Sequence, residues 1–492
     1  MSNLSSLSYY IPELIIISAI LLIIILDIIP STKPYTFNLA LASIIASAFF
    51  LCQNYGESHS LFMGMIALDP FSHYFKYIFL FATFSIILIS RFDRQLDKKY
   101  ASEYNCLLLI VLLGLFLMSS SVNLLMIYLS IELVSIPSYI LAGMLKNDKE
   151  SNEASLKYVI FGSLASGLML FGLSILYGIT GSTDISGISS ALQIIEFPLT
   201  IYFPLILILA GFGYKISMVP FHFWTPDVYE GAPTPITAFL SVAPKAAGFA
   251  LLIRFFNTLF GTGQPLNSPA WQAMEGVPWQ NILMVLAAVT MTVGNLVAIQ
   301  QKNIKRLLAY SSIAHAGYIL MGVPVLSQEG VYAIVFYIIV YLFMQLGAFF
   351  LAIVVSNRYG TETIEEYSGI GWKSPYLGFF MAVFMFSLTG IPPTAGFIGK
   401  MYLFAALING GSQFYWLAII GVLNSVISLY YYMRVVKVMY FQGEREKDLY
   451  VPDGMSAVIV LAMAIPSIYF GIRWSFLADW VNSSLKFFIA GF

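Results

Sequence analysis

The sequence has few of the side chains that carry out chemistry in soluble enzymes. Its 492 residues include two cysteines and four histidines, and 10% are charged, whereas a soluble domain is about 25% charged. Cys52 and Cys106 match no metal or redox spacing, and no Gly-rich phosphate loop or nucleophile elbow is present. We therefore expect no metal, no cofactor and no redox centre in this chain. A net charge of −1 gives no indication of a nucleic-acid partner.

Long apolar runs dominate instead. Hydrophobic residues make up 59% of the chain, and the mean hydropathy is +0.83. Runs of about 20 apolar residues predict transmembrane helices. We predict an all-α polytopic membrane protein in a lipid bilayer, with fourteen spans at residues 9–29, 36–53, 71–90, 104–120, 122–145, 156–178, 202–224, 236–257, 279–300, 304–324, 330–355, 374–410, 414–440 and 454–473. The first run has no basic segment before it, which predicts a retained helix and not a signal peptide.

The basic residues predict the orientation. They gather in alternate connections, at Lys33; Arg91, Arg94, Lys98 and Lys99; Lys146, Lys149 and Lys157; Lys302, Lys305 and Arg306; Arg358 and Lys373; Arg445 and Lys447. Basic connections face the cytoplasm, so both termini are expected on the periplasmic side. Arg254 is the main exception. The connection 225–235 should also face inward, and its Asp227 and Glu230 are expected in a solvated loop.

Two of the predicted spans, the seventh and the twelfth, contain helix breakers. Proline interrupts 217–226 and 389–396, and it removes a backbone donor and clashes with the preceding turn. Paired breaks at corresponding positions indicate inverted-repeat transporters. We therefore predict two inverted five-helix repeats, spans four to eight and nine to thirteen. The expected units are 1–103 (three helices), 104–257 (first repeat), 258–440 (second repeat) and 441–492 (one helix and a tail).

Four ionisable residues interrupt apolar runs near their middles: Glu132, Lys215, Lys245 and Lys400. With a rise of about 1.5 Å per residue, each lies roughly 14–20 Å inside a core about 30 Å thick. Charge at that depth costs at least about 2.5–3.5 kcal/mol, so it is rare without a function. Lysines outnumber acids, so pairing cannot neutralise them all, and the set predicts a path for protons or cations. The alternative is a set of structural ion pairs that lock helices together.

Four further residues are candidate accessories to this path. Glu153 and Lys157 have the i, i+4 spacing of a helical ion pair, either an ordinary surface pair or the cytoplasmic mouth of the path. His222 lies inside the seventh-span break and His315 on the tenth span. Histidine relays protons near neutral pH, although a packing role is the alternative for each.

The same residues carry a family resemblance. The stretches are SIELVSIP at 130–137, EASLKY at 153–158, GYKISMVPFHFWTPDVYEGAP at 213–233, NIKRLLAYSSI at 303–313 and GIPPTAGFIGK at 390–400. Together they resemble the antiporter-like membrane subunits of respiratory complex I, over roughly residues 100–440. Lys400 and the absence of a long C-terminal lateral helix are typical of the subunit N type, the counterpart of the chloroplast B and mitochondrial 2 subunits.

The resemblance implies roles for the matching residues. Glu132 and Lys215 would form a separable pair, Lys245 a central relay, and Lys400 would face the second half-channel. The pair Glu153 and Lys157 would lie near the cytoplasmic side.

It also implies a function for the assembly. This would be a proton-translocating enzyme of the NADH:quinone oxidoreductase type, which oxidises NADH or another donor and reduces quinone, and whose FMN, iron–sulfur clusters and quinone lie in partner subunits. Its partners would be an antiporter-like sister and small membrane subunits, and the membrane would be a bacterial inner membrane, with a thylakoid as the less favoured alternative. Two alternatives stay open: a subunit of a standalone cation/proton antiporter without redox coupling, and a purely structural membrane spacer.

Overall fold

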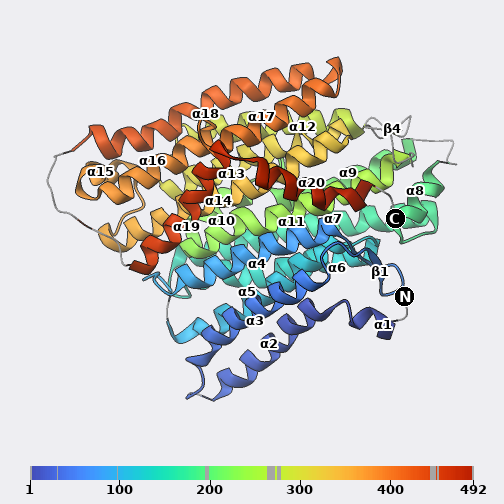
Figure 1. Ribbon diagram of the computed structural model, residues 1–492, viewed down its shortest axis with the longest axis horizontal. Coiled ribbons are helices and arrows are strands. Elements are labelled where there is room, and N and C mark those ends of the chain that lie inside the picture. Colours follow the sequence, from blue (N-terminus) through green and yellow to red (C-terminus); the bar gives the residue numbers. More distant parts are fainter. Residues whose placement is uncertain are drawn as a thin grey trace.

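The computed structural model describes residues 3–489 apart from 30, 97, 194–198, 263–271, 274–278, 444–449 and 451–453. Helices with roughly parallel axes form one elongated bundle (Figure 1), and both chain ends lie at the same end of it. Within the described residues, twelve helical segments are long and apolar enough to cross a membrane, and three shorter apolar helices accompany them. The chain is thus an all-α polytopic membrane protein, as predicted.

The first elements run from one edge of the bundle into its interior. They are α1 (Asn3–Leu7), α2 (Ile11–Ile28), α3 (Tyr35–Gln53), the antiparallel strands β1 (His59–Leu61) and β2 (Ile66–Leu68), and α4 (Pro70–Ser90). Asp69 begins α4 with a capping box, in which its carboxylate accepts the Ser72 amide at 2.7 Å. The Arg254 guanidinium binds the same carboxylate through two hydrogen bonds of 2.8 and 2.9 Å. The basic residue that breaks the charge alternation is therefore neutralised inside the protein.

The middle of the chain supplies two successive runs of helices. The first comprises η1 (Lys98–Tyr100), α5 (Ala101–Ser120), α6 (Leu124–Ala142), α7 (Lys149–Thr180), α8 (Ile185–Leu192), α9 (Leu199–Ile216), α10 (Trp224–Gly231), α11 (Thr234–Phe260) and the short strands β3 (Gly261–Thr262) and β4 (Gln272–Ala273). The second comprises α12 (Trp279–Ala298), α13 (Ile304–Leu320), η2 (Val323–Val325), α14 (Gln328–Tyr359), η3 (Ile364–Tyr367), α15 (Ile370–Lys373), α16 (Pro375–Thr389), α17 (Ala395–Asn409), η4 (Ser412–Phe414) and α18 (Tyr415–Phe441).

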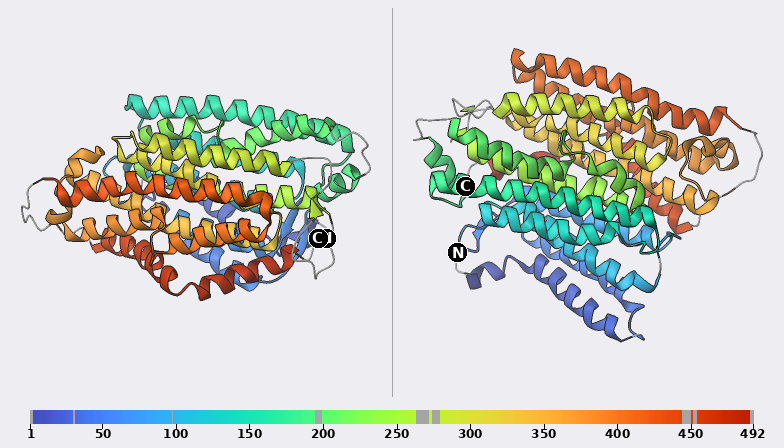
Figure 2. Two further views of the ribbon diagram at one scale, coloured as in Figure 1. Left: turned by 90° about the horizontal axis from the view of Figure 1, so that it is seen from above. Right: turned by 180° about the vertical axis from the view of Figure 1, so that it is seen from behind.

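The chain closes with α19 (Gly454–Ile472) and α20 (Ser475–Ile489). α20 packs against α4 and α14 and lies along one face of the bundle, as the turned views show (Figure 2). Residues 441–492 were expected to hold one helix and a tail, and the described part of that tail is this second helix.

The two runs share local features about 180 residues apart. Asn123 and Asn303 each cap a helix, α6 and α13, with their side chains. Each also makes a β-bridge to a residue beyond a 32-residue helix, to Asp184 after α7 and to Thr363 after α14. Both long helices end at a glycine in the left-handed region. The same devices thus recur in the same order in both runs.

The predicted breaks occur where the prolines lie. α9 ends at Ile216 and α10 begins at Trp224, while α16 ends at Thr389 and α17 begins at Ala395. The prediction that Asp227 and Glu230 lie in a solvated loop was wrong: both lie on helix α10, which packs against α7 and α13. Helix α7 also begins earlier than the predicted residue 156, because Asp148 caps its first turn. Arg445 and Lys447 lie outside the described residues.

Candidate functional site

Lys215 lies in the last turn of α9, beside the first break. Its buried ammonium donates a hydrogen bond to the Ser135 hydroxyl on α6, with 2.9 Å between Nζ and Oγ. Glu132 lies one turn before Ser135 on α6, and its Oε1 is buried without a hydrogen-bond partner among the described residues. Glu132 and Lys215 are thus held apart but remain within electrostatic range.

Lys245 lies at the centre of α11, a helix buried along its whole length. Its ammonium donates to the Ser312 hydroxyl on α13 at 2.7 Å. A cavity of about 10 Å³ adjoins it, lined in part by Ser312 and Tyr341, and the Tyr341 hydroxyl is buried without a described partner. Such a volume is near the minimum for one water molecule.

Lys215 and Lys245 approach each other through Gly248. This glycine lies about one turn after Lys245 on α11, and a Cβ at this position would contact Cβ and Cγ of Lys215 at 3.6 Å. The side chain of Lys215 therefore crosses α11 next to the turn that carries Lys245.

One face of α13 leads from Lys245 towards Lys400. Ser312, His315 and Tyr318 recur every three residues and so share a face. Ser312 binds Lys245, and the Tyr318 ring lies under the Lys400 ammonium at 4.5 Å. His315 lies between them, within electrostatic range of both lysines.

Two tyrosines hold the His315 ring in place. Tyr337 on α14 is 2.8 Å from Nδ1, and Tyr432 on α18 is 3.0 Å from Nε2. Both hydroxyls are donors and acceptors, and the Tyr432 hydroxyl also bonds the hydroxyl of Ser311. All these groups are buried, so His315 belongs to a continuous polar chain and is not an isolated packing residue.

Lys400 lies at the second break. Its ammonium donates to the carbonyl oxygens of Thr389 at 2.8 Å and Leu388 at 3.3 Å, at the end of α16. Carbonyls at a helix end have no partner within the helix and carry partial negative charge. Gly390 makes this approach possible, because it adopts φ +85° and a Cβ there would lie 2.9 Å from Cδ of Lys400.

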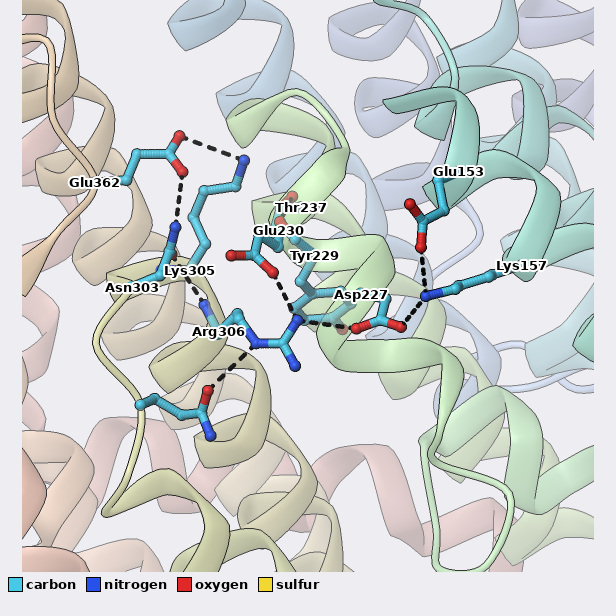
Figure 3. A network of polar contacts seen from close by, with 11 residues as sticks. Glu153, Lys157, Asp227, Tyr229, Glu230, Thr237, Asn303, Lys305, Arg306 and Glu362 are labelled. Atoms are coloured by element: carbon cyan, nitrogen blue, oxygen red, sulfur yellow. Dashed lines mark hydrogen bonds and ion pairs between the residues drawn. The ribbon is translucent and has the colours of Figure 1, made fainter. Parts of the chain in front are cut away.

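A network of ion pairs joins α7, α10 and α13 (Figure 3). Lys157 pairs with Glu153 at 2.7 Å, as predicted, and also with Asp227 at 2.5 Å. Arg306 on α13 pairs with Asp227 at 2.9 Å and Glu230 at 2.6 Å. The acidic connection expected to be a solvated loop therefore joins α7 of the first run to α13 of the second.

A second arm of this network involves Lys305. Its ammonium lies 3.4 Å from the Glu362 carboxylate and donates to the Ala232 carbonyl at 2.9 Å. Asp93, in the connection after α4, lies within electrostatic range of both charged groups. Burial outweighs the hydrogen bond from the Gln95 amide and raises the pKa of Asp93 to about 6.

His222 is not joined to the path. It lies in the first break, buried, with its ring against that of Phe223 at 4.5 Å between centroids. Its Nδ1 has no described hydrogen-bond partner. Of the two histidines, the structure brings only His315 to the lysines.

One buried pair was not predicted from the sequence. Lys76 on α4 and Glu13 on α2 lie 2.6 Å apart, and each is 2% exposed. The signal was present, because Lys76 interrupts the apolar run 71–90. Asp69 was also missed, since it directly precedes the run. Among the described residues, no group of three or more His, Cys, Asp or Glu is arranged to hold a metal ion.

Comparison with known proteins places this geometry. A sequence profile described as NADH:quinone oxidoreductase/Mrp antiporter, TM, matches residues 121–428. A relative from Anaeromyxobacter sp. (strain Fw109-5), NADH-quinone oxidoreductase subunit N, is 42% identical over 99% of this chain and 98% of its own. A chain of respiratory complex I from Thermus thermophilus superposes with a TM-score of 0.78 at 29% identity, covering 95% of this chain and 98% of that one.

A chain of the Mrp complex from Dietzia sp. shares the fold, with a TM-score of 0.79 at 20% identity over 96% of both chains. The profile match and the subunit N relatives extend over the helices that carry all eight candidate residues. The chain therefore belongs to the NADH:quinone oxidoreductase/Mrp antiporter family, and within it to the subunit N group of NADH-quinone oxidoreductases.

Proposed function

We propose that this chain is a proton-translocating membrane subunit of a complex I-type quinone oxidoreductase. The proton passes by way of Glu132, Lys215, Lys245 and Lys400, while the redox reaction takes place in other subunits. The observation that carries the proposal is the row Ser312, His315 and Tyr318 on α13, which connects two buried lysines from different helix runs. Structural ion pairing would require carboxylate partners, and the partners here are hydroxyls, backbone carbonyls and an aromatic ring.

The pair Glu132 and Lys215 takes up the proton in the first step of the path. A buried ammonium is stabilised by a nearby carboxylate and destabilised when the carboxylate moves away. Ser135 holds Lys215 while Glu132 Oε1 is left without a partner, which is the separated state of this pair. Lys215 in that state transfers its proton towards Lys245.

The second half of the path uses hydroxyls and the imidazole. Groups that both donate and accept a hydrogen bond pass a proton by taking one and releasing another. His315 and the hydroxyls of Tyr337 and Tyr432 have this property. One water in the small cavity beside Lys245 would extend the chain. Lys400 receives the proton at the end of α16.

The network at Lys157 is the cytoplasmic mouth. Glu153 and Lys157 are 64% and 36% exposed, and they lie near the start of α7, next to a connection with basic residues. Asp227 and Arg306 tie this mouth to α13, the helix that carries the relay. His222 is assigned no step.

The paired features of the two helix runs support an inverted repeat. An offset of five membrane crossings reverses the direction of every helix, which suits a path with one half-channel on each side. The repeats are 104–257 and 258–440, flanked by the N-terminal unit 1–103 and the C-terminal unit 441–492. The basic connections support periplasmic positions for both termini, and the proposed membrane is a bacterial inner membrane.

The partners are a sister antiporter-like subunit and small membrane subunits of the complex. FMN, iron–sulfur clusters and the quinone site belong to other subunits. The co-purified subunits distinguish this proposal from a standalone antiporter. Affinity purification of the tagged chain should recover iron–sulfur subunits, and recovery of membrane subunits alone would favour the antiporter.

The direct test is Lys245→Met in the assembled complex in proteoliposomes. Methionine keeps the volume and removes the proton carrier, so the protons moved per electron should fall, while the complex should still assemble. Lys302→Met is the matched control, because Lys302 is exposed and lies on the same helix connection as the network. Equal proton-to-electron ratios in the two variants would contradict the assignment of the path.

A further inference from the structure

A large cavity opens between the N-terminal helices, next to the second arm of the ion-pair network, with which it shares Asp93. It has a volume of about 1560 Å³ and lies between the start of α3, the end of α4, the start of α5 and the connection from α6 to α7. All these helix ends belong to connections that carry basic residues, so the cavity lies where the bilayer surface meets the cytoplasm. Its volume exceeds that of an ordinary small-molecule pocket.

The lining carries an excess of positive charge. Five basic and three acidic side chains line the cavity: Lys33, Arg91, Lys99, Lys146 and Lys149, with Asp93, Asp148 and Glu150. Two of the three acids are turned to local backbone amides. Asp148 accepts from the Glu150 amide at 2.9 Å, and Asp93 accepts from the Gln95 amide at 2.7 Å. The basic side chains therefore determine the character of the lining.

Aromatic rings position two of these cations without neutralising them. The Arg91 guanidinium lies over the Phe37 ring at 4.9 Å, and the Lys146 ammonium lies over the Tyr100 ring at 4.1 Å. A ring attracts a cation through its quadrupole and leaves its net charge unchanged. Lys33, by contrast, is paired with Asp27 at 2.9 Å. Arg91 and Lys146 are thus oriented cations with charge left for an anion.

We propose that this cavity binds the phosphate headgroup of an anionic glycerophospholipid from the cytoplasmic leaflet. Basic pockets between transmembrane helices on this side suit anionic lipid headgroups. Phe37, Leu96 and Met144 also line the cavity, and they give the glycerol backbone and the first acyl carbons an apolar surface. With Lys33 paired to Asp27, four basic and three acidic side chains remain in the lining, and Arg91 and Lys146 are the cations placed to bind the phosphate. The proposal does not depend on the proton path.

The test uses the purified complex in nanodiscs of phosphatidylcholine, with and without 10% diphosphatidylglycerol. Lipid retained per complex after mild detergent extraction is measured by mass spectrometry. The double variant Arg91→Gln with Lys146→Gln should bind diphosphatidylglycerol roughly 30-fold more weakly, because two cations near a phosphate are removed. Less of this lipid should therefore be retained. The control is Lys302→Gln with Lys437→Gln, two exposed basic residues outside this cavity, which should retain lipid as the wild type does.

Two results would overturn the proposal. One is equal retention in the wild type and the Arg91/Lys146 variant, which is also the outcome if another subunit fills the cavity. The other result concerns 20 mM inorganic phosphate added to the wild-type complex in phosphatidylcholine. The proposal fails if phosphate displaces no lipid but raises the unfolding temperature as much as diphosphatidylglycerol does. The site would then bind a free ion. Stabilisation by the lipid alone, lost in the Arg91/Lys146 variant, supports a lipid site.

Discussion

His315 offers the sharpest separation of proton transfer from packing. We consider His315→Phe, which keeps a planar ring of similar volume on α13 but removes both nitrogens. Tyr432 would still bond Ser311, whereas Tyr337 would lose the partner that lies 2.8 Å away. A buried hydroxyl without a partner costs about 1–3 kcal/mol, so the variant should unfold at a lower temperature.

The double variant His315→Phe with Tyr337→Phe removes that unpaired hydroxyl. It should recover most of the lost stability, because replacing both partners by apolar groups is nearly neutral. It should not recover proton transfer, since the relay between Lys245 and Lys400 is still missing. Loss of a positioned proton-transfer group lowers the rate by about 100-fold or more.

The assay measures both properties on the same preparation. Thermal unfolding of the purified complex reports stability. Acidification of proteoliposomes, coupled to quinone reduction, reports proton movement. We expect the double variant to unfold near the wild-type temperature but to pump no protons. If the double variant regains pumping along with stability, His315 is a packing residue and the relay on α13 is refuted.

Three further predictions concern charged groups outside that relay. Burial raises the Asp93 pKa from 3.8 to about 6, so the free energy of unfolding should fall as pH rises through that window. Asp93→Asn should stabilise the complex by at most about 3 kcal/mol at pH 7.5 and not at all near pH 4. Thermal unfolding at the two pH values tests this. Arg254→Leu should cost about 3–5 kcal/mol because it leaves the Asp69 carboxylate buried and unpaired, and adding Asp69→Asn should restore much of the loss in thermal unfolding; no recovery would mean that the pair is not the cause. Asp227→Asn weakens the contacts with Lys157 and Arg306, but all three side chains are roughly one-third exposed, so the loss should be about 1 kcal/mol or less per contact. The loss should shrink in 1 M salt, and a salt-independent loss would argue against ionic contacts.

The costly features of the path could be predicted from sequence. A lysine in the middle of an apolar run stands out because lipid and protein interior both disfavour charge, and a proline stands out because it cannot complete a helix. Lys215, Lys400 and both breaks were therefore predicted. Ser312 and Tyr318 were not, because a hydroxyl is common in membrane helices and carries no such cost. Their role depends on which lysine each faces, which is a property of packing.

The error at Asp227 has a related cause. Acidic residues next to a helix break suggest a solvated loop when only neighbours in sequence are considered. Their partners, Lys157 and Arg306, lie about 70 and 80 residues away along the chain, on helices that pack against α10 only in the folded bundle. Lys76 was missed for the opposite reason, since a single lysine near the end of a predicted span resembles an interfacial residue until Glu13 is placed beside it.

The complete burial of α11 has a consequence for membrane insertion. This helix carries both Lys245 and Arg254, so it is poorly suited to lipid by itself. Because α4 precedes α11 in the chain, Asp69 has already been synthesised when Arg254 leaves the ribosome. Ser312, the partner of Lys245, has not yet been synthesised. Lys245 therefore gains its hydrogen-bond partner only after α13 has been made, so the order of synthesis bears on how this helix reaches its final contacts.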